Sequence, residues 1–76
     1  MKLSYDPKHN IAYLRIHEKV GQVTTIKLSD DMNIDIAPDG TVYGIEFLNA
    51  NDQLTEDRGA IIVELEGKRH EIKLVA

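Results

Sequence analysis

Asp35 and Glu46 are the side chains of this 76-residue chain whose chemistry and expected placement best suit a functional site. Both lie in segments that alternate polar and apolar residues, the pattern of β-strands with one face in a core. If the two segments pair as a hairpin, the carboxylates lie diagonally on one face, within reach of a shared proton, cation or ligand. Two such groups do general acid and base work when a pocket raises one pKa. The alternative is a sheet face that is solvated or covered by ion pairs.

The hairpin that would bring these carboxylates together is predicted around Asp39-Gly40. Asp-Gly is favoured at the centre of a two-residue type I′ turn, where both residues need positive φ. The predicted pairs are Ile36 with Tyr43, Ile34 with Ile45, and Met32 with Phe47. A three-residue loop would shift the register by one and mix the faces, so the hydrophobic pattern selects the tighter turn.

The other face of this hairpin is a candidate interaction face. It carries Asn33, Asp35, Gly44 and Glu46. A glycine within a strand costs stability and often marks a bulge or a close approach by another backbone or a ligand. A partner segment that covers Gly44 is therefore as consistent with the pattern as a substrate.

Other motifs indicate neither a metal nor a cofactor. Asp31 to Asp35 has the alternating oxygens with which EF-hand calcium loops begin, but Ile36 and Val42 stand where such a loop needs Gly and Glu. The histidines are His9, His17 and His70, and no two of them have a spacing that presents both imidazoles to one ion. Neither Ser4 nor Ser29 lies in a nucleophile elbow, and no glycine-rich phosphate loop is present.

The composition excludes several classes of protein. The net charge of −4 opposes the electrostatic attraction on which nucleic-acid binding relies, so we expect no nucleic-acid partner. The chain has no cysteine, and its apolar runs are too short for a signal peptide or a membrane span. We therefore expect a cytoplasmic protein, and residues 1–76 are long enough for a single domain only.

The fold class expected is all-β. Ile and Val number 14 against 5 Ala and 7 Leu, a balance that favours strands. The pattern predicts about seven short antiparallel strands in hairpin and meander succession, and at most one helical turn near 49–54, which Asn49 and Asn51 can cap. A closing hairpin around Glu66-Gly67 sets Ile61 opposite Ile72, Val63 opposite His70, and Glu64 opposite Arg69.

The predicted core follows from the same alternation. Its central part is Ile34, Ile36, Tyr43, Ile45 and Phe47, completed by Leu3, Tyr5, Leu14, Ile16, Ile26 and Leu28. The residues expected on opposite faces are Val23, Val42, Leu48 and Ile62. A one-sided sheet would leave these four in water unless a second layer covers them.

Three short segments occur in an order and spacing that point to one family. They are Leu3-Ser4-Tyr5-Asp6-Pro7, then Ala12-Tyr13-Leu14-Arg15-Ile16, then Asn33-Ile34-Asp35 followed by residues 39–50. Over about residues 3–50 the chain resembles the small prokaryotic family catalogued as domain of unknown function 2283. The resemblance implies a small antiparallel β domain and lends no catalytic residue. His9-Asn10-Ile11 departs from the acidic residue that the family commonly has before the alanine.

Two classes of function remain open from the sequence. The first is a non-catalytic module that binds another small protein or itself, since a short chain rarely builds a deep pocket and a small sheet leaves edges that need cover. We expect a homodimer, joined by a sheet edge or by the face around Gly44, because small domains without disulfides or metal often gain stability by oligomerising. The alternative is a small-ligand-binding or hydrolytic enzyme that uses Asp35 and Glu46.

Overall fold

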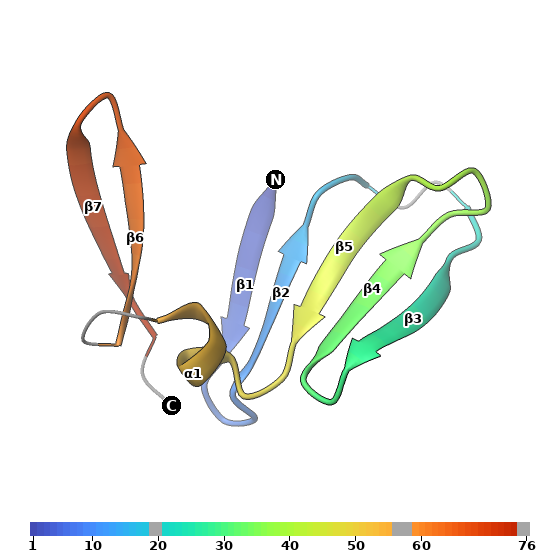
Figure 1. Ribbon diagram of the computed structural model, residues 1–76, viewed down its shortest axis with the longest axis horizontal. Coiled ribbons are helices and arrows are strands. Elements are labelled where there is room, and N and C mark those ends of the chain that lie inside the picture. Colours follow the sequence, from blue (N-terminus) through green and yellow to red (C-terminus); the bar gives the residue numbers. More distant parts are fainter. Residues whose placement is uncertain (19–20, 56–58, 75–76) are drawn as a thin grey trace.

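The computed structural model describes residues 1–18, 21–55 and 59–74. Within these ranges the chain forms seven antiparallel strands and one short helix (Figure 1), so the all-β prediction is confirmed. The elements are β1 (Lys2–Asp6), β2 (Ile11–Arg15), β3 (Thr24–Ser29), β4 (Met32–Ile36), β5 (Val42–Phe47), α1 (Ala50–Leu54), β6 (Ala60–Leu65) and β7 (Lys68–Lys73).

Strands β1 to β5 form what we call the main sheet, in the order β1-β2-β5-β4-β3. Two units that are local in sequence make it up, namely the β1–β2 hairpin and the β3–β4–β5 meander. Pairing of β2 with β5 joins them and sets Tyr13 opposite Glu46 and Leu14 opposite Ile45. This pairing could not be read from the local pattern, because it depends on contacts between distant segments.

The loop between β4 and β5 differs from the predicted type I′ turn. The Gly40 N–H donates to the Ala37 carbonyl at 3.0 Å, and the Ala37 N–H donates to the Thr41 carbonyl at 2.8 Å. The loop therefore has three residues, with Pro38 at the position of a type I turn that favours proline. Gly40, at φ 91°, takes the left-handed position, whereas Asp39 does not have positive φ.

A register shift next to this loop preserves most of the predicted pairing. Ile36 lies opposite Val42, so the predicted pair of Ile36 with Tyr43 was wrong. The shift between Asp35 and Ile36 then absorbs the extra loop residue, as a β-bulge does. Beyond it the register is as predicted, and Ile34 lies opposite Ile45. Because Val42 pairs with Ile36, it shares the apolar side, and its predicted place on the opposite side was also wrong.

The C-terminal hairpin, formed by β6 and β7, has the predicted register, including Val63 opposite His70 and Glu64 opposite Arg69. Glu66 and Gly67 both have positive φ, as a type I′ turn requires. The hairpin forms its own small sheet and projects away from the main sheet, near the end where α1 lies (Figure 1).

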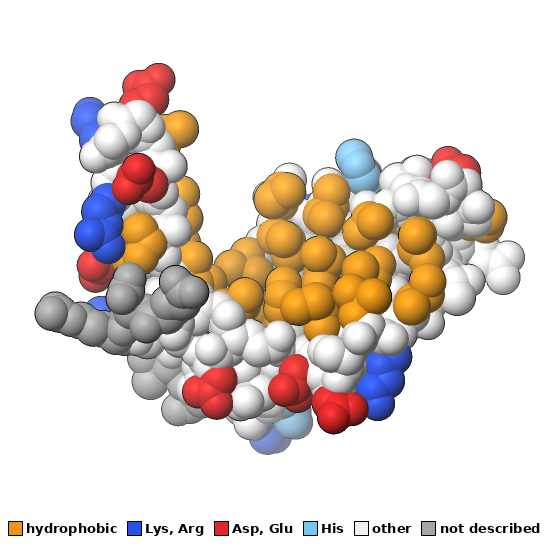
Figure 2. Space-filling view, in the orientation of Figure 1, with side chains coloured by type: hydrophobic (Ala, Val, Ile, Leu, Met, Phe, Trp, Pro, Cys, Tyr) orange, Lys and Arg blue, Asp and Glu red, His pale blue; other side chains and the backbone are white. Residues whose placement is uncertain are grey.

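The register gives the main sheet two sides, because directly opposed residues project to the same side. The apolar face, as we call one side, consists of Leu3, Tyr5, Ala12, Leu14, Thr24, Ile26, Met32, Ile34, Ile36, Val42, Tyr43, Ile45 and Phe47. Figure 2 shows hydrophobic side chains spread across the main sheet, with charged side chains at its rim.

Burial of the apolar face differs from the prediction. Among the described residues no large side chain is fully buried, and the buried hydrophobic residues are Ala12, Tyr43, Ala50, Ala60 and Leu74. Ile26 is 44% exposed and Leu28 is 54% exposed. The predicted core residues of paired strands do share one face, but the expectation that Ile26, Leu28 and Leu3 are buried was wrong. The reason is that the C-terminal hairpin projects outward and does not lie across the sheet (Figure 2).

Candidate functional site

The polar face, on the other side of the main sheet, carries both candidate carboxylates. We define it by Tyr13, Thr25, Asn33, Asp35, Gly44 and Glu46. Asp35 on β4 accepts two hydrogen bonds, from the Tyr13 hydroxyl to Oδ2 and from the Thr25 hydroxyl to Oδ1, each 2.7 Å long. Glu46 on β5 accepts one from the Asn33 amide at 2.9 Å. The bonds from Thr25 and Asn33 link neighbouring strands, whereas the bond from Tyr13 on β2 reaches across β5 to β4.

Gly44 is the residue that allows Tyr13 to reach Asp35. Tyr13 comes from β2 and Asp35 from β4, with β5 between them. A Cβ at Gly44 would lie within 3.0 Å of three atoms at the hydroxyl end of the Tyr13 ring. The close approach expected at this glycine is therefore made by the chain's own tyrosine, whose ring crosses β5 above the glycine backbone.

Tyr13 holds its proton unusually tightly. Desolvation raises the pKa of Tyr13 to about 12, and the hydrogen bond to Asp35 and the negative charges of Asp35 and Glu46 act in the same direction. The phenol thus stays a hydrogen-bond donor across the physiological range. A phenol with this pKa is a poor general acid at neutral pH.

The two candidate carboxylates share a face, as their predicted register requires, but each has its own donors. Asp35 accepts from hydroxyl groups and Glu46 from an amide, which is how a polar sheet surface satisfies its carboxylates. Across the described ranges, no group of three or more His, Asp or Glu side chains is arranged to hold a metal ion.

An open pocket of about 310 Å³ adjoins the polar face and is lined by Tyr13, Arg15, His17 and Glu18. Sequence reasoning did not group these residues, because His17 and Glu18 lie beyond the strand that carries Tyr13 and Arg15 and form no recognisable motif with them. The pocket brings one cation, one anion and an imidazole near the ring that covers Gly44.

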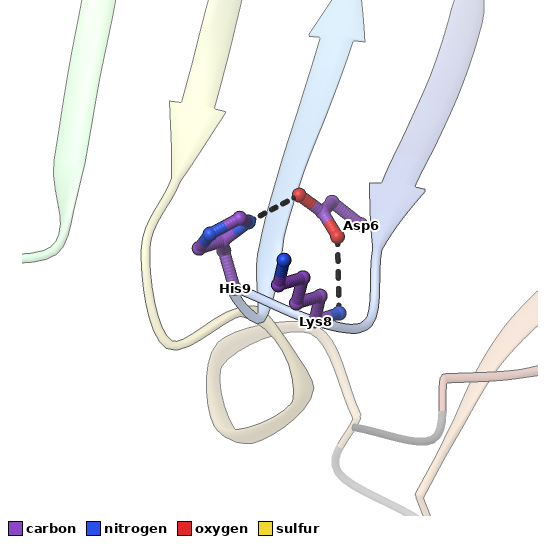
Figure 3. A network of polar contacts seen from close by, with 3 residues as sticks. All are labelled: Asp6, Lys8 and His9. Atoms are coloured by element: carbon purple, nitrogen blue, oxygen red, sulfur yellow. Dashed lines mark hydrogen bonds and ion pairs between the residues drawn. The ribbon is translucent and has the colours of Figure 1, made fainter.

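A second polar cluster fixes the turn between β1 and β2, as Figure 3 shows. Asp6 Oδ1 accepts the Lys8 backbone N–H at 3.0 Å, and Oδ2 lies 2.7 Å from His9 Nδ1. The bond to His9 is the main cause of a lowered pKa at the Asp6 carboxyl. All three side chains are exposed, so this cluster shapes a turn on the surface.

Asn10 ties that turn to helix α1. Its Oδ1 accepts the Asn51 backbone N–H at 3.0 Å, and its Nδ2 donates to Asn51 Oδ1 at 2.7 Å. The Tyr5 hydroxyl donates to Asn10 Oδ1 at 2.9 Å. The predicted helical turn is confirmed and Asn49 occupies its N-cap position, but the Asn49 side chain makes no capping hydrogen bond. Asn10, 41 residues away in sequence from Asn51, supplies the acceptor.

The remaining sequence candidates lie apart. His70 is on β7 and His17 lines the open pocket, so the histidines are not brought together. Ser4 lies on β1 opposite Tyr13, and Ser29 Oγ accepts the Asp31 backbone N–H at 3.3 Å in the β3–β4 turn. Asn33 and Asp35 lie on strand β4 and not in a calcium-binding loop.

Comparison with known proteins places the chain in a family without giving it an activity. The search of curated proteins and the search of solved structures returned no match. In the described part of the chain, no helix has the length and hydrophobicity needed to cross a membrane. A family model described as "Protein of unknown function (DUF2283)" matches residues 2–51, which run from the first residue of β1 to the asparagine held by Asn10. The chain belongs to the DUF2283 family.

Proposed function

We propose that this protein is a non-catalytic protein-binding module whose docking surface is the apolar face of the main sheet. The observation that carries the proposal is the exposure of large apolar side chains on and beside that face, with Leu3 at 38%, Ile26 at 44% and Leu28 at 54%. Burying apolar surface is worth about 25 cal/mol per Å², so an uncovered sheet face favours association with another polypeptide.

The polar face supports the same proposal, because its polar groups already have partners within the chain and it is therefore the less suitable docking surface. Its carboxylates accept hydrogen bonds from Tyr13, Thr25 and Asn33, and the ring of Tyr13 covers the one backbone position without a side chain. A surface whose polar groups are already paired gains little from a partner. We propose the cytoplasm as the compartment, because a chain without cysteine suits a reducing environment.

Affinity capture with the tagged 76-residue chain tests this function. The test variant is Leu3→Lys, which places a charge on the apolar face at an exposed position of β1. The matched control is Ser4→Lys, which adds the same charge to the next residue, on the opposite side of the sheet. We expect the wild type and Ser4→Lys to retain a stoichiometric protein partner and Leu3→Lys to lose it, with unchanged circular dichroism throughout.

The double variant Asp35→Asn/Glu46→Gln separates this function from an enzyme that uses the two carboxylates. A binding module keeps its partner when both are neutralised, whereas such an enzyme loses its activity while its fold stays intact. Capture that survives Leu3→Lys but fails in the double variant would overturn the proposal.

A further inference from the structure

The single chain exposes more surface than a monomer of its mass should. Its accessible surface is 5684 Å², about 1,000 Å² more than the ~4,700 Å² typical of a monomeric protein of 8.6 kDa. Its radius of gyration is 13.6 Å, against about 11 Å for a compact chain of this length. The excess is close to the ~800 Å² that each partner buries in a standard protein–protein interface.

The shape of the exposed surface suits packing of one sheet on another. The molecule measures 37 × 30 × 18 Å, so it is thin in the direction that a second layer would fill. Two sheets that pack face to face lie about 10 Å apart and interdigitate the side chains of their inner faces. The apolar face offers such side chains on each strand of the main sheet.

The charge pattern of the apolar face favours a copy of itself as the partner. Its residues include no Asp, Glu, Lys, Arg or His, although 29% of the chain is charged. A face without charge offers no complementarity to a charged surface, whereas it matches an identical face without repulsion. A two-fold axis that brings the same patch of two copies together gives a closed interface.

The C-terminal hairpin extends this surface. Ile61, Val63 and Ile72 share one side of it, and Val63 and Ile72 are 45% and 47% exposed. In Figure 2 the hydrophobic side chains of the hairpin lie mainly along the side turned toward the main sheet, and an open space separates the two. A second main sheet on the apolar face would therefore meet apolar side chains of the hairpin at its margin.

We infer that the occupant of the apolar face is a second copy of this chain, in a two-fold dimer closed by the C-terminal hairpins. The inference rests on the proposed function, since it names the partner of the same face. In the dimer the large side chains that no single chain buries become the core between two main sheets. Each hairpin lies against the edge of the partner's sheet.

Light scattering coupled to size exclusion tests the inference on the purified 76-residue chain. We expect twice the 8.6 kDa chain mass for the wild type and for Ser4→Lys at micromolar concentration. Leu3→Lys should raise the dimer dissociation constant by at least about tenfold, because it buries an unpaired ammonium group in the interface. Ile72→Gln should also weaken the dimer, whereas Lys73→Gln, on the other side of the hairpin, should not.

Each other outcome has a definite meaning. In one such outcome, the wild type stays monomeric from low to high micromolar concentration and still captures a different protein in a way that Leu3→Lys abolishes. That result would overturn the inference that the partner is a second copy, but the proposed protein-binding function would stand. A dimer that both Leu3→Lys and Ile72→Gln leave intact places the contact elsewhere and overturns the inference. If Leu3→Lys fails to fold, Ile26→Lys with Lys27→Gln as control repeats the test on β3.

Discussion

Tyr13 and Gly44 lie one above the other on the polar face, with the end of the tyrosine ring where the Cβ of any larger residue would stand. The two residues belong to β2 and β5, the strands whose pairing joins the two local units of the main sheet. The side chain of Tyr13 continues beyond Gly44 to Asp35 on β4. One tyrosine thus spans three adjacent strands, and a glycine in the middle strand makes room for it.

The stacking of Tyr13 on Gly44 predicts a coupled pair of substitutions. Gly44→Ala should lower the free energy of unfolding by about 1–3 kcal/mol, because the new methyl group meets the ring. In a Tyr13→Ala background the same substitution should cost clearly less, since the obstacle is gone. Urea denaturation of the four proteins measures the coupling. Equal costs in both backgrounds would show that the ring does not exclude a side chain.

Tyr13 should also make stability depend on alkaline pH. Its pKa is raised from 10.0 to about 12 in the folded chain, so the folded state holds the proton more tightly than the unfolded state. The resulting stabilisation is complete below pH 10 and is lost as the pH rises toward 12. Tyr13→Phe lacks this contribution.

Unfolding in urea between neutral pH and about pH 11 checks this dependence. Near neutral pH, Tyr13→Phe should cost about 1–2 kcal/mol, because Asp35 loses one donor. The difference between wild type and variant should shrink above pH 10. A constant difference over the whole range would contradict the raised pKa.

Asn10 offers a test of the link between the β1–β2 turn and α1. Asn10 has φ 54°, and its side chain holds the Asn51 amide. Asn10→Gly and Asn10→Ala both remove that bond, but alanine also pays about 1 kcal/mol for the left-handed backbone. We expect Asn10→Ala to be the less stable of the two. Hydrogen exchange at the Asn51 amide should be faster in both, and unchanged exchange would mean that Asn10 does not hold the helix.

Gly40 and Gly21 form a matched pair for backbone strain. Both have open space around them, but Gly40 has φ 91° and Gly21 does not have positive φ. Gly40→Val should cost about 2 kcal/mol or more, because a β-branched residue is strained at that φ. Gly21→Ala should be neutral or slightly stabilising. Thermal melting of both variants checks this, and a neutral Gly40→Val would argue against the three-residue loop.

The inferred dimer makes stability depend on protein and salt concentration. Unfolding of a dimer is concentration-dependent, so the melting temperature should rise with protein concentration. Each chain carries a net charge of −4, and added salt screens the repulsion between copies. We therefore expect the dissociation constant to fall between low and moderate NaCl. Sedimentation velocity over a salt series measures it, with Leu3→Lys as the reference whose dimer is weakened.

Local patterns predict local pairing well in this chain. Alternation of apolar residues places Ile34 opposite Ile45, and the Glu66-Gly67 turn places Ile61 opposite Ile72, both as found. The two-residue turn predicted at Asp39-Gly40 was wrong because Pro38, followed two residues later by Gly40, favours a type I turn with a left-handed fourth residue. The bulge that restores the register leaves no signature in the sequence.

Features that join distant segments could not be predicted. A glycine within a strand suggested a close approach at Gly44. That the approaching group is the Tyr13 ring could not be predicted, because it depends on β2 lying beside β5. The bond of Asn10 to Asn51 likewise requires the completed sheet. Periodicity also indicates which side of a strand is apolar, but it does not indicate whether another part of the chain covers that side. The sequence therefore predicted Ile26 in the core, although the structure leaves it exposed.

The strand order has a consequence for growth of the assembly. The outer strands of the main sheet are β1 and β3, and an edge-to-edge contact between these two different strands would be head-to-tail and would continue into a filament. Lys2 on β1, Lys27 on β3 and the register shift beside Lys27 all oppose such addition. Association through the apolar face instead consumes that face in both copies, so this contact stops at two chains, and the edge strands keep the features that oppose further addition.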